Sequence, residues 1–205
     1  MKTTTIRFSL LALVAGALTL SSTAGAEGWF KELDDPKEVT LGEVLRHPHD
    51  FVDVAIEFEA YFDSMGKSFN PYYTRFTEEL YGNFAAWPMN ARLYEKRDYQ
   101  HAFPLLFVAR LNPVLKKVRE LDRFTPIVVT GCVRDVFRGQ PWIEVGSFKR
   151  HGDGLTQNDV RNVVAGDAYF GAGRYDEAAK HYHRATRGDA PDVVKVDLLR
   201  RLADA

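Results

Sequence analysis

The chain has 205 residues, of which 27 are lysine or arginine and 28 are aspartate or glutamate, so its formal net charge at pH 7 is −1. Proteins that hold nucleic acid gain much of their affinity by neutralising phosphates with clustered basic residues, and this composition has no such surplus. The single cysteine excludes a disulfide within one molecule. Stability therefore has to come from burial of the 45% of residues that are hydrophobic.

The N-terminus has the three parts of a secretory signal peptide, which we assign to residues 1–26. Lys2 and Arg7 make a basic start, residues 8–20 are apolar and uncharged, and Ala24-Gly25-Ala26 is a small-residue cleavage signal. The apolar stretch is shorter than the roughly 20 residues that a membrane-spanning helix needs. We therefore expect cleavage after Ala26, a periplasmic or secreted protein, and no transmembrane segment in the mature chain.

The next part of the chain predicts an extended lead-in, a short helix and a strand. Residues 27–40 are charged and lack apolar periodicity. Thr40 and Glu43 have the spacing of a capping box, and His47-Pro48 ends the helix, because the residue before a proline is disfavoured in helical conformation. Apolar and polar residues then alternate over 52–63, the pattern of a strand with one buried face.

Further segments of strand length follow, separated by turn residues. Asn112-Pro113 opens a helix in the middle of this series, and Gly131 lies inside a strand run, where a bulge is the usual reason for glycine. Two connections without a clear period, 64–82 and 89–103, are long. The predicted strands are 83–87, 105–111, 127–137 and 142–148.

The order strand, strand, strand, helix, strand, strand resembles the oligonucleotide- and oligosaccharide-binding (OB) fold, a five-stranded barrel with a helix between its third and fourth strands. The resemblance covers residues 41–150 and is carried by the segments 52–63 and 129–135. The two long connections depart from the compact pattern of that fold. An open antiparallel sheet backed by two helices is the other arrangement that fits the same segments.

The C-terminal part returns to helical period after a linker at 151–158. Two helices at 159–172 and 176–187 are joined by a glycine turn, and a third begins at Pro191. Small and large residues recur through the helices at the spacing of two packed antiparallel helices: Gly166, Tyr169, Gly173, Ala178, Tyr182 and Ala185.

This order of small and large residues resembles one tetratricopeptide repeat (TPR), over residues 159–192, followed by a capping helix that completes a segment of 159–205. Asn162 stands where that family usually has a large aromatic, and Pro191 comes one position late. The resemblance implies a protein-binding or packing role. The whole chain is thus expected to be α+β, with a small five-stranded OB-like barrel before a TPR-like hairpin.

A single repeat cannot bury its own apolar face, so it has to pack on the barrel, on a second copy or on another protein. The first functional hypothesis is an exported, non-enzymatic adaptor or scaffold that binds a protein of the cell envelope, or a second copy of itself, through these helices. The residues expected to make the contact are Arg174, Tyr175, Lys180, His181, Leu198 and Leu202.

The second hypothesis is a ligand-binding barrel. Tyr61 and Trp87 lie on predicted strands, where members of the OB fold stack bases or sugars, and Arg134 supplies a cation nearby. A glycan or another small anionic ligand fits an exported protein better than nucleic acid does. Large side chains also fill the interior of small barrels, so these aromatics have an equally simple role in the core.

Neither a metal, a cofactor nor an enzymatic activity is indicated by a motif. His47, His49 and Asp50 are close together, but no fourth ligand lies at a fixed distance from them. None of the linear signatures of hydrolases, phosphate-binding loops or zinc proteases occurs. Cys132 lies in an apolar run and is expected to be a buried small hydrophobe. An enzyme and a nucleic-acid-binding protein stay as lesser alternatives, since sites assembled in three dimensions leave no linear trace.

Overall fold

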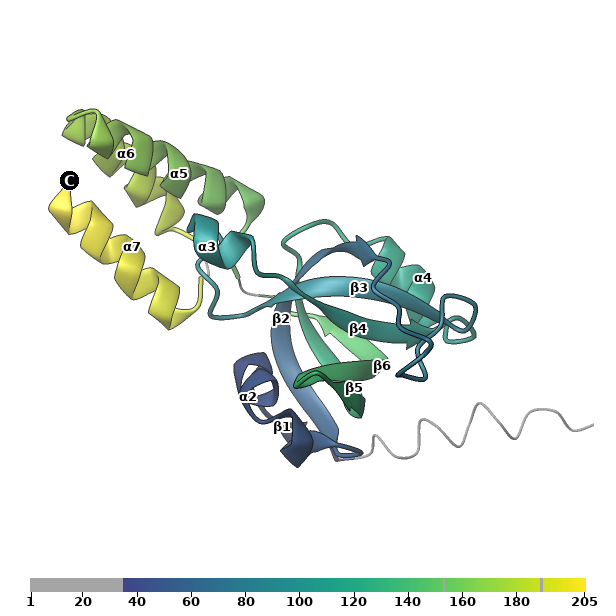
Figure 1. Cartoon of the computed structure of the whole chain (residues 1–205). Coiled ribbons are helices and arrows are strands. Elements are labelled where there is room, and N and C mark those ends of the chain that lie inside the picture. Colours follow the sequence, from purple (N-terminus) through teal and green to yellow (C-terminus); the bar gives the residue numbers. More distant parts are fainter. Residues whose placement is uncertain (1–34, 153, 189) are drawn as a thin grey trace, which may run out of the picture.

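A computed structural model describes residues 35–152, 154–188 and 190–205. The expected signal peptide and most of the lead-in lie outside these residues. The protein is α+β, as predicted, with a six-stranded mixed sheet and helices at its C-terminal end (Figure 1). Within the described residues, no helix combines the length and the apolar character that crossing a bilayer requires.

The first elements follow from local sequence signals. The capping box at the start of α2 (Leu41–Arg46) is confirmed, because the Thr40 hydroxyl accepts from the Glu43 N–H at 3.1 Å and the Glu43 carboxylate accepts from the Thr40 N–H at 2.8 Å. A 3₁₀ helix, η2 (Pro48–Phe51), then leads to β2 (Ala55–Gly66). β2 begins three residues later than predicted, because Asp53 has a φ of 57°, which interrupts extended backbone.

The sheet has the strand order β1-β2-β3-β4-β6-β5, and β5 pairs again with β2. β2 forms hydrogen-bonded pairs with both β5 and β3, because its residues 55–61 pair with β5 and its residues 60–66 pair with β3. The pairs β1–β2 and β4–β6 are parallel, and the others are antiparallel. The strands not yet given are β1 (Lys37–Glu38), β3 (Tyr81–Pro88), β4 (Phe103–Ala109), β5 (Pro126–Phe137) and β6 (Gln140–Arg150).

Two details differ from the predicted sheet. A sixth strand, β1, is present where only an extended lead-in was expected. Pro104 was expected to precede β4 but lies inside it, at an irregularity in the β3–β4 register where a missing N–H does least harm. The buried Asn83 amide donates to the carbonyl oxygen of Pro104 at 2.7 Å and to that of Leu106 at 3.1 Å, which supports the irregular backbone.

The predicted bulge at Gly131 is confirmed by a register shift between Thr130 and Gly131 in the β5–β6 pair. A Cβ added at Gly131 would lie 2.5 Å from the carbonyl oxygen of Glu144, so only glycine allows the two strands to approach this closely. Cys132, the next residue, is buried as expected.

Three helices follow the sheet at its far end: α5 (Gln157–Gly171), α6 (Tyr175–Ala185) and α7 (Asp192–Asp204). α5 begins with a second capping box, in which the Thr156 hydroxyl accepts from the Asp159 N–H at 3.2 Å and the Asp159 carboxylate accepts from the Thr156 N–H at 2.9 Å. Two short helices lie in connections, α3 (Lys96–Tyr99) and α4 (Val114–Arg119). Figure 1 shows α3 between the strands and the C-terminal helices.

Close contact between α5 and α6 depends on the small residue at position 166. A Cβ added at Gly166 would lie 2.6 Å from the ring of Tyr182, which is itself buried and donates a 2.7 Å hydrogen bond to Asp167. The predicted spacing of Gly166 and Tyr182 is thus the spacing of a helix contact.

We expect Gly166→Ala to lower the free energy of unfolding by about 1–3 kcal/mol, because an ordered ring has to move. Gly171→Ala on the same helix is the matched control, since an added Cβ there has nothing within 4 Å. That control should be neutral or stabilising by up to about 1 kcal/mol. Chemical denaturation followed by circular dichroism measures both, and equal effects would contradict this account of the helix contact.

Candidate binding surfaces

The inner face of the C-terminal helices packs on the chain itself. A second hydrophobic cluster, separate from the interior of the sheet, joins Leu198, Val194 and Val163 of these helices to residues that precede them in sequence. The contributing residues that precede α5 are Tyr61, Trp87, Ala91, Leu93, Tyr94, Phe124 and Leu155. Most of these residues come from β3 and the β3–β4 connection, so this connection covers the apolar face that a lone hairpin would leave open.

A polar network surrounds one side of this docking contact. Tyr94 donates a hydrogen bond to the Asp197 carboxylate at 2.8 Å. Arg201 of α7 donates to Asp197 at 3.1 Å and to Asp167 of α5 at 2.5 Å, and it also pairs with Glu95 of the β3–β4 connection. Arg201 therefore binds carboxylates of two helices and of the connection at once, which holds α7 against α5 and the β3–β4 connection.

The network shifts the titration of its members. Burial alone would raise the pKa of the Asp197 carboxyl, but hydrogen bonds from Tyr94 and Arg201 outweigh burial and hold that pKa below its ordinary value. Burial, with a hydrogen bond to Asp167, raises the pKa of Tyr182 to about 12. A carboxyl with a lowered pKa stabilises the fold above its unfolded pKa of about 4, and this contribution is lost as the pH falls through the lowered value. The hydrogen bonds of the Asp197 carboxylate therefore contribute fully at neutral pH.

The residues predicted to bind a protein differ in how far they are exposed. Leu198 is fully buried and Leu202 packs against the same cluster, so both contact the chain itself, and their assignment to a partner surface is corrected. Arg174, Tyr175 and Lys180 are exposed. His181 is partly buried, stacks on Tyr169 and bonds the Asn162 side chain at 3.1 Å.

The exposed members lie at two neighbouring places on the hairpin. The hairpin tip consists of Phe170, Arg174 and Tyr175, where the two rings meet edge to face at 5.3 Å between centroids. Figure 1 shows that this turn is the end of the hairpin farthest from the sheet. The α6 basic face consists of Lys180 and Arg184, which lie one turn apart on the helix, and of Arg187 in the turn that follows it; all three side chains are exposed.

The residues predicted to bind a small ligand are unsuited to that role. Tyr61 and Trp87 have no exposed surface, because they belong to the second hydrophobic cluster, which lies beneath the C-terminal helices and which we call the docking cluster. The Tyr61 hydroxyl accepts from the Leu155 N–H at 3.0 Å, and the Trp87 indole donates to the Tyr99 carbonyl at 3.1 Å. The Arg134 guanidinium is nearly buried and pairs with Asp53 at 3.0 Å and Glu144 at 3.2 Å. Stacking of a ligand on these residues is therefore excluded in this conformation.

An exposed aromatic surface is found elsewhere, and the sequence hypotheses did not include it. The tyrosine-loop surface consists of Tyr72, Tyr73, Phe137 and Arg138. Tyr72 is 91% exposed and Tyr73 is 70% exposed, and the Tyr73 ring stacks on Phe137 at 4.8 Å. The Arg138 guanidinium lies 5.4 Å from the centre of the Phe137 ring.

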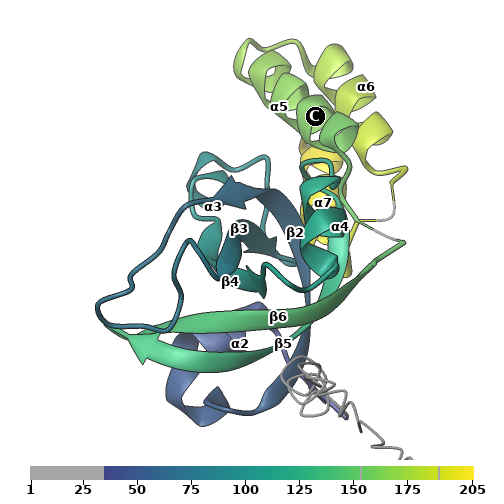
Figure 2. The ribbon, with the colours of Figure 1, turned by 90° about the vertical axis from the view of Figure 1, so that its right-hand side faces the viewer.

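Figure 2 shows how this surface forms, because the β2–β3 connection runs to the turn of the β5–β6 hairpin. Two further contacts hold the connection there. Arg75 pairs with Asp135 at 3.4 Å, and Phe76 stacks on Trp142 at 5.9 Å. The sequence signal for the exposed tyrosines is the turn at Asn70-Pro71, since consecutive aromatics that follow such a turn cannot all point inward.

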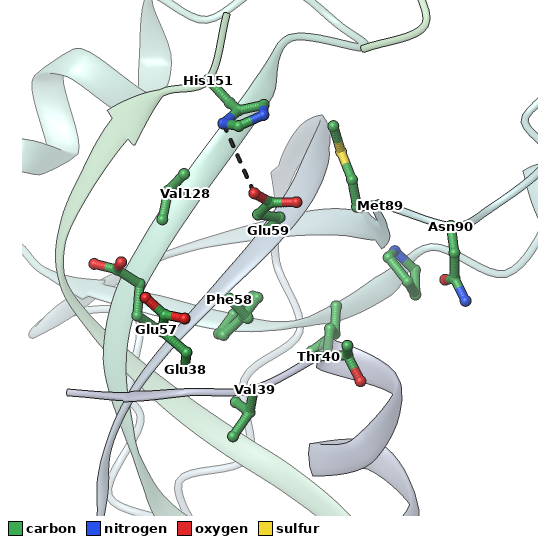
Figure 3. A pocket seen from close by; sticks show the side chains of 12 residues that line it. Glu38, Val39, Thr40, Glu57, Phe58, Glu59, Met89, Asn90, Val128 and His151 are labelled. Atoms are coloured by element: carbon green, nitrogen blue, oxygen red, sulfur yellow. Dashed lines mark ion pairs between the residues drawn. The ribbon is translucent and has the colours of Figure 1, made fainter. Parts of the chain in front are cut away.

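A pocket of about 490 Å³ lies beside β2, between residues 38–41 and the start of the β3–β4 connection (Figure 3). Glu38, Glu57 and Glu59 line it, and His151 pairs with Glu59 at 3.8 Å. Its apolar lining includes Val39 and Phe58. The negative charge of this wall disfavours the anionic ligand that the second hypothesis expected.

Among the residues that the structure describes, no three or more histidine, cysteine, aspartate or glutamate side chains converge as a metal site would need. No protein-family model matches the sequence, and a search of curated proteins finds no relative. The functional argument therefore rests on the exposed surfaces themselves.

We expect Arg201→Met to lower the free energy of unfolding by about 2–3 kcal/mol, because the buried carboxylate of Asp197 loses its principal cation. Arg200→Met is the matched control on the same helix, since the Arg200 side chain is 74% exposed and only approaches Asp197 to 4.0 Å. The control should change stability by less than about 0.5 kcal/mol. Hydrogen exchange of α7 gives a second measurement, and unchanged protection in Arg201→Met would refute the role of the network.

Proposed function

We propose that this chain is an exported, non-enzymatic adaptor whose helical hairpin binds an acidic surface of another envelope protein. The observation that carries the proposal is the division of the hairpin into two sides. Its apolar inner side packs on the β3–β4 connection, and its outer side presents the α6 basic face beside the aromatic rings of the hairpin tip. Exposed aromatics anchor protein interfaces, and clustered cations select a partner of opposite charge.

The architecture that we propose for this adaptor is an OB-like barrel carrying a TPR-like hairpin. Support for the barrel comes from the pairing of β5 with β2, from the parallel β4–β6 pair, and from the position of α4 between β4 and β5. Support for the TPR likeness comes from the contact of Gly166 with Tyr182 and from the burial of Ala178 and Ala185. The barrel serves as the base, and the hairpin extends from it.

Export is supported by the N-terminal sequence pattern of basic start, apolar stretch and small-residue cleavage signal. Loss of the first 26 residues leaves 25 basic and 28 acidic residues, so the mature chain carries a net charge of −3. The basic face of α6 is therefore a local feature on a mildly acidic protein, which favours an oriented encounter over general attraction to anions.

We expect the charge reversal Lys180→Glu/Arg184→Glu to reduce capture of a specific envelope protein by about tenfold or more, because it replaces attraction by repulsion. The measurement is affinity capture with the tagged full chain, followed by quantitative mass spectrometry at low and high salt. Tyr175→Ala should weaken the same interaction without changing its salt dependence.

The matched control is Lys116→Glu/Lys117→Glu on α4, which changes the net charge equally at exposed positions far from the hairpin. This control should capture the same protein as the parent chain. Equal capture by both charge-reversed variants, or loss only in the α4 variant, would contradict the adaptor proposal.

A second candidate function is binding of an acidic glycan at the tyrosine-loop surface. The specific observation is the exposed Tyr72 ring beside the Tyr73–Phe137 stack, with Arg138 at its edge. Sugar rings pack on aromatic faces, and a guanidinium binds a carboxylate of the same ligand. This surface replaces Tyr61, Trp87 and Arg134 as the location of a ligand site.

We expect a uronic-acid-containing oligosaccharide to bind the parent chain, and Tyr72→Ala/Tyr73→Ala to weaken that binding by about tenfold, because the stacking faces are lost. Calorimetric titration measures both. Tyr175→Ala, at the other end of the molecule, is the control and should bind normally. Tighter binding of a single-stranded oligonucleotide than of the oligosaccharide would show that the ligand class is wrong.

A further inference from the structure

Both the inner and the outer side of α7 carry apolar side chains. Val194 and Leu198 point into the docking cluster. Val193, Val196 and Leu199 are 57%, 67% and 55% exposed, respectively, and form what we call the α7 outer stripe. Figure 1 shows α7 at the edge of the described part of the chain.

Such a stripe is unusual on the solvent side of a helix. A helix face that meets water normally carries polar side chains, and contiguous exposed apolar residues mark interaction surfaces. Charged residues lie at both ends of the stripe, Asp192 before it and Arg200 beside its end, and the partly buried Lys195 flanks it. An apolar centre with a charged rim is the arrangement of a protein interface.

We propose that the α7 outer stripe packs against the same stripe of a second copy of this chain, with the two α7 helices antiparallel about a two-fold axis at Val196. The surface is distinct from the hairpin tip and from the α6 basic face, so the dimer leaves the adaptor surface open.

The positions of the charges identify a second copy as the occupant. Val193 and Leu199 lie three residues on either side of Val196, and Asp192 and Arg200 lie four residues on either side. In an antiparallel pair centred on Val196, Asp192 of each copy comes to the level of Arg200 of the other, so opposite charges meet at both ends. A parallel pair in register would instead bring like charges together.

The side chain of Arg200 is suited to this contact. It is 74% exposed, and its only ion pair among the described residues is the 4.0 Å approach to Asp197. The Asp197 carboxylate already accepts hydrogen bonds from Tyr94 and Arg201. Arg200 can therefore turn to a second copy without breaking the docking contact.

The expected dimer is weak. A helix of 13 residues is about 20 Å long, and one helix face per copy buries less than a standard interface. We expect a dissociation constant of about 10–100 μM.

The test is sedimentation velocity of the full chain, purified after export, over a concentration series that brackets this range. Val196→Lys places two ammonium groups at the axis and should abolish the dimer, a change of more than about tenfold in the dissociation constant. Leu111→Lys is the matched control, because Leu111 is 93% exposed on the β4–α4 connection and should leave the dimer unchanged.

A charge-swap series tests the antiparallel geometry. Asp192→Arg and Arg200→Asp should each weaken the dimer by about threefold to tenfold, and the double variant should restore it, because the swap recreates opposite charges at both ends. Val196→Cys should form a disulfide between copies on mild oxidation, while Cys132 stays unreactive because it is buried.

A monomer at every concentration would overturn the proposal. So would a dimer that survives Val196→Lys, or a double charge swap that fails to restore association. The adaptor proposal is tested separately. A monomeric Val196→Lys variant that still captures its envelope protein leaves the α6 basic face as the partner site. Conversely, the α6 variants that lose capture should still form the dimer.

Discussion

The structure depends on one constraint, which is that three short helices cannot bury an apolar face by themselves. The chain meets this constraint internally, because the β3–β4 connection supplies Leu93 and Tyr94, and β3 supplies Trp87, to fill that face. Arg201 then fixes the arrangement through carboxylates on α5, α7 and the connection. These contacts join α7 to the middle of the chain, so the C-terminal helices pack directly on the residues that follow β3.

This internal packing decides which surfaces are left for function. Aromatic residues near the docking contact, such as Tyr61 and Trp87, are used for stability and are closed to ligands. The side chains that face solvent differ in character from one region to another: cationic on α6, aromatic at the tyrosine loop, aliphatic on α7 and anionic in the pocket beside β2. Each region therefore suits a different class of partner, and opposite charges on separate faces make an oriented encounter possible.

Signals confined to a few neighbouring residues were sufficient for much of the fold. The capping box at Thr40, the alternation in β2 and the bulge at Gly131 could be predicted because each depends on local geometry. The docking contact could not, since Tyr94 and Asp197 are 103 residues apart and neither has a local pattern that indicates the other. The same limit explains why the prediction of Tyr61 as a ligand-binding residue is wrong. Alternation along β2 places Tyr61 on the outer face of the strand, and the C-terminal helices then cover that face.

The completion of the aromatic cluster by α7 also affects synthesis of the protein. α7 is made after β3 and the β3–β4 connection, so Trp87 and Tyr94 are synthesised before the helix that completes their cluster. A truncated chain that stops before residue 192 would retain its sheet strands but expose the hydrophobic aromatic residues that α7 covers. Chaperones and proteases recognise exposed surfaces of this kind. Quality control in the cell can thus distinguish chains in which α7 is docked from chains in which it is not.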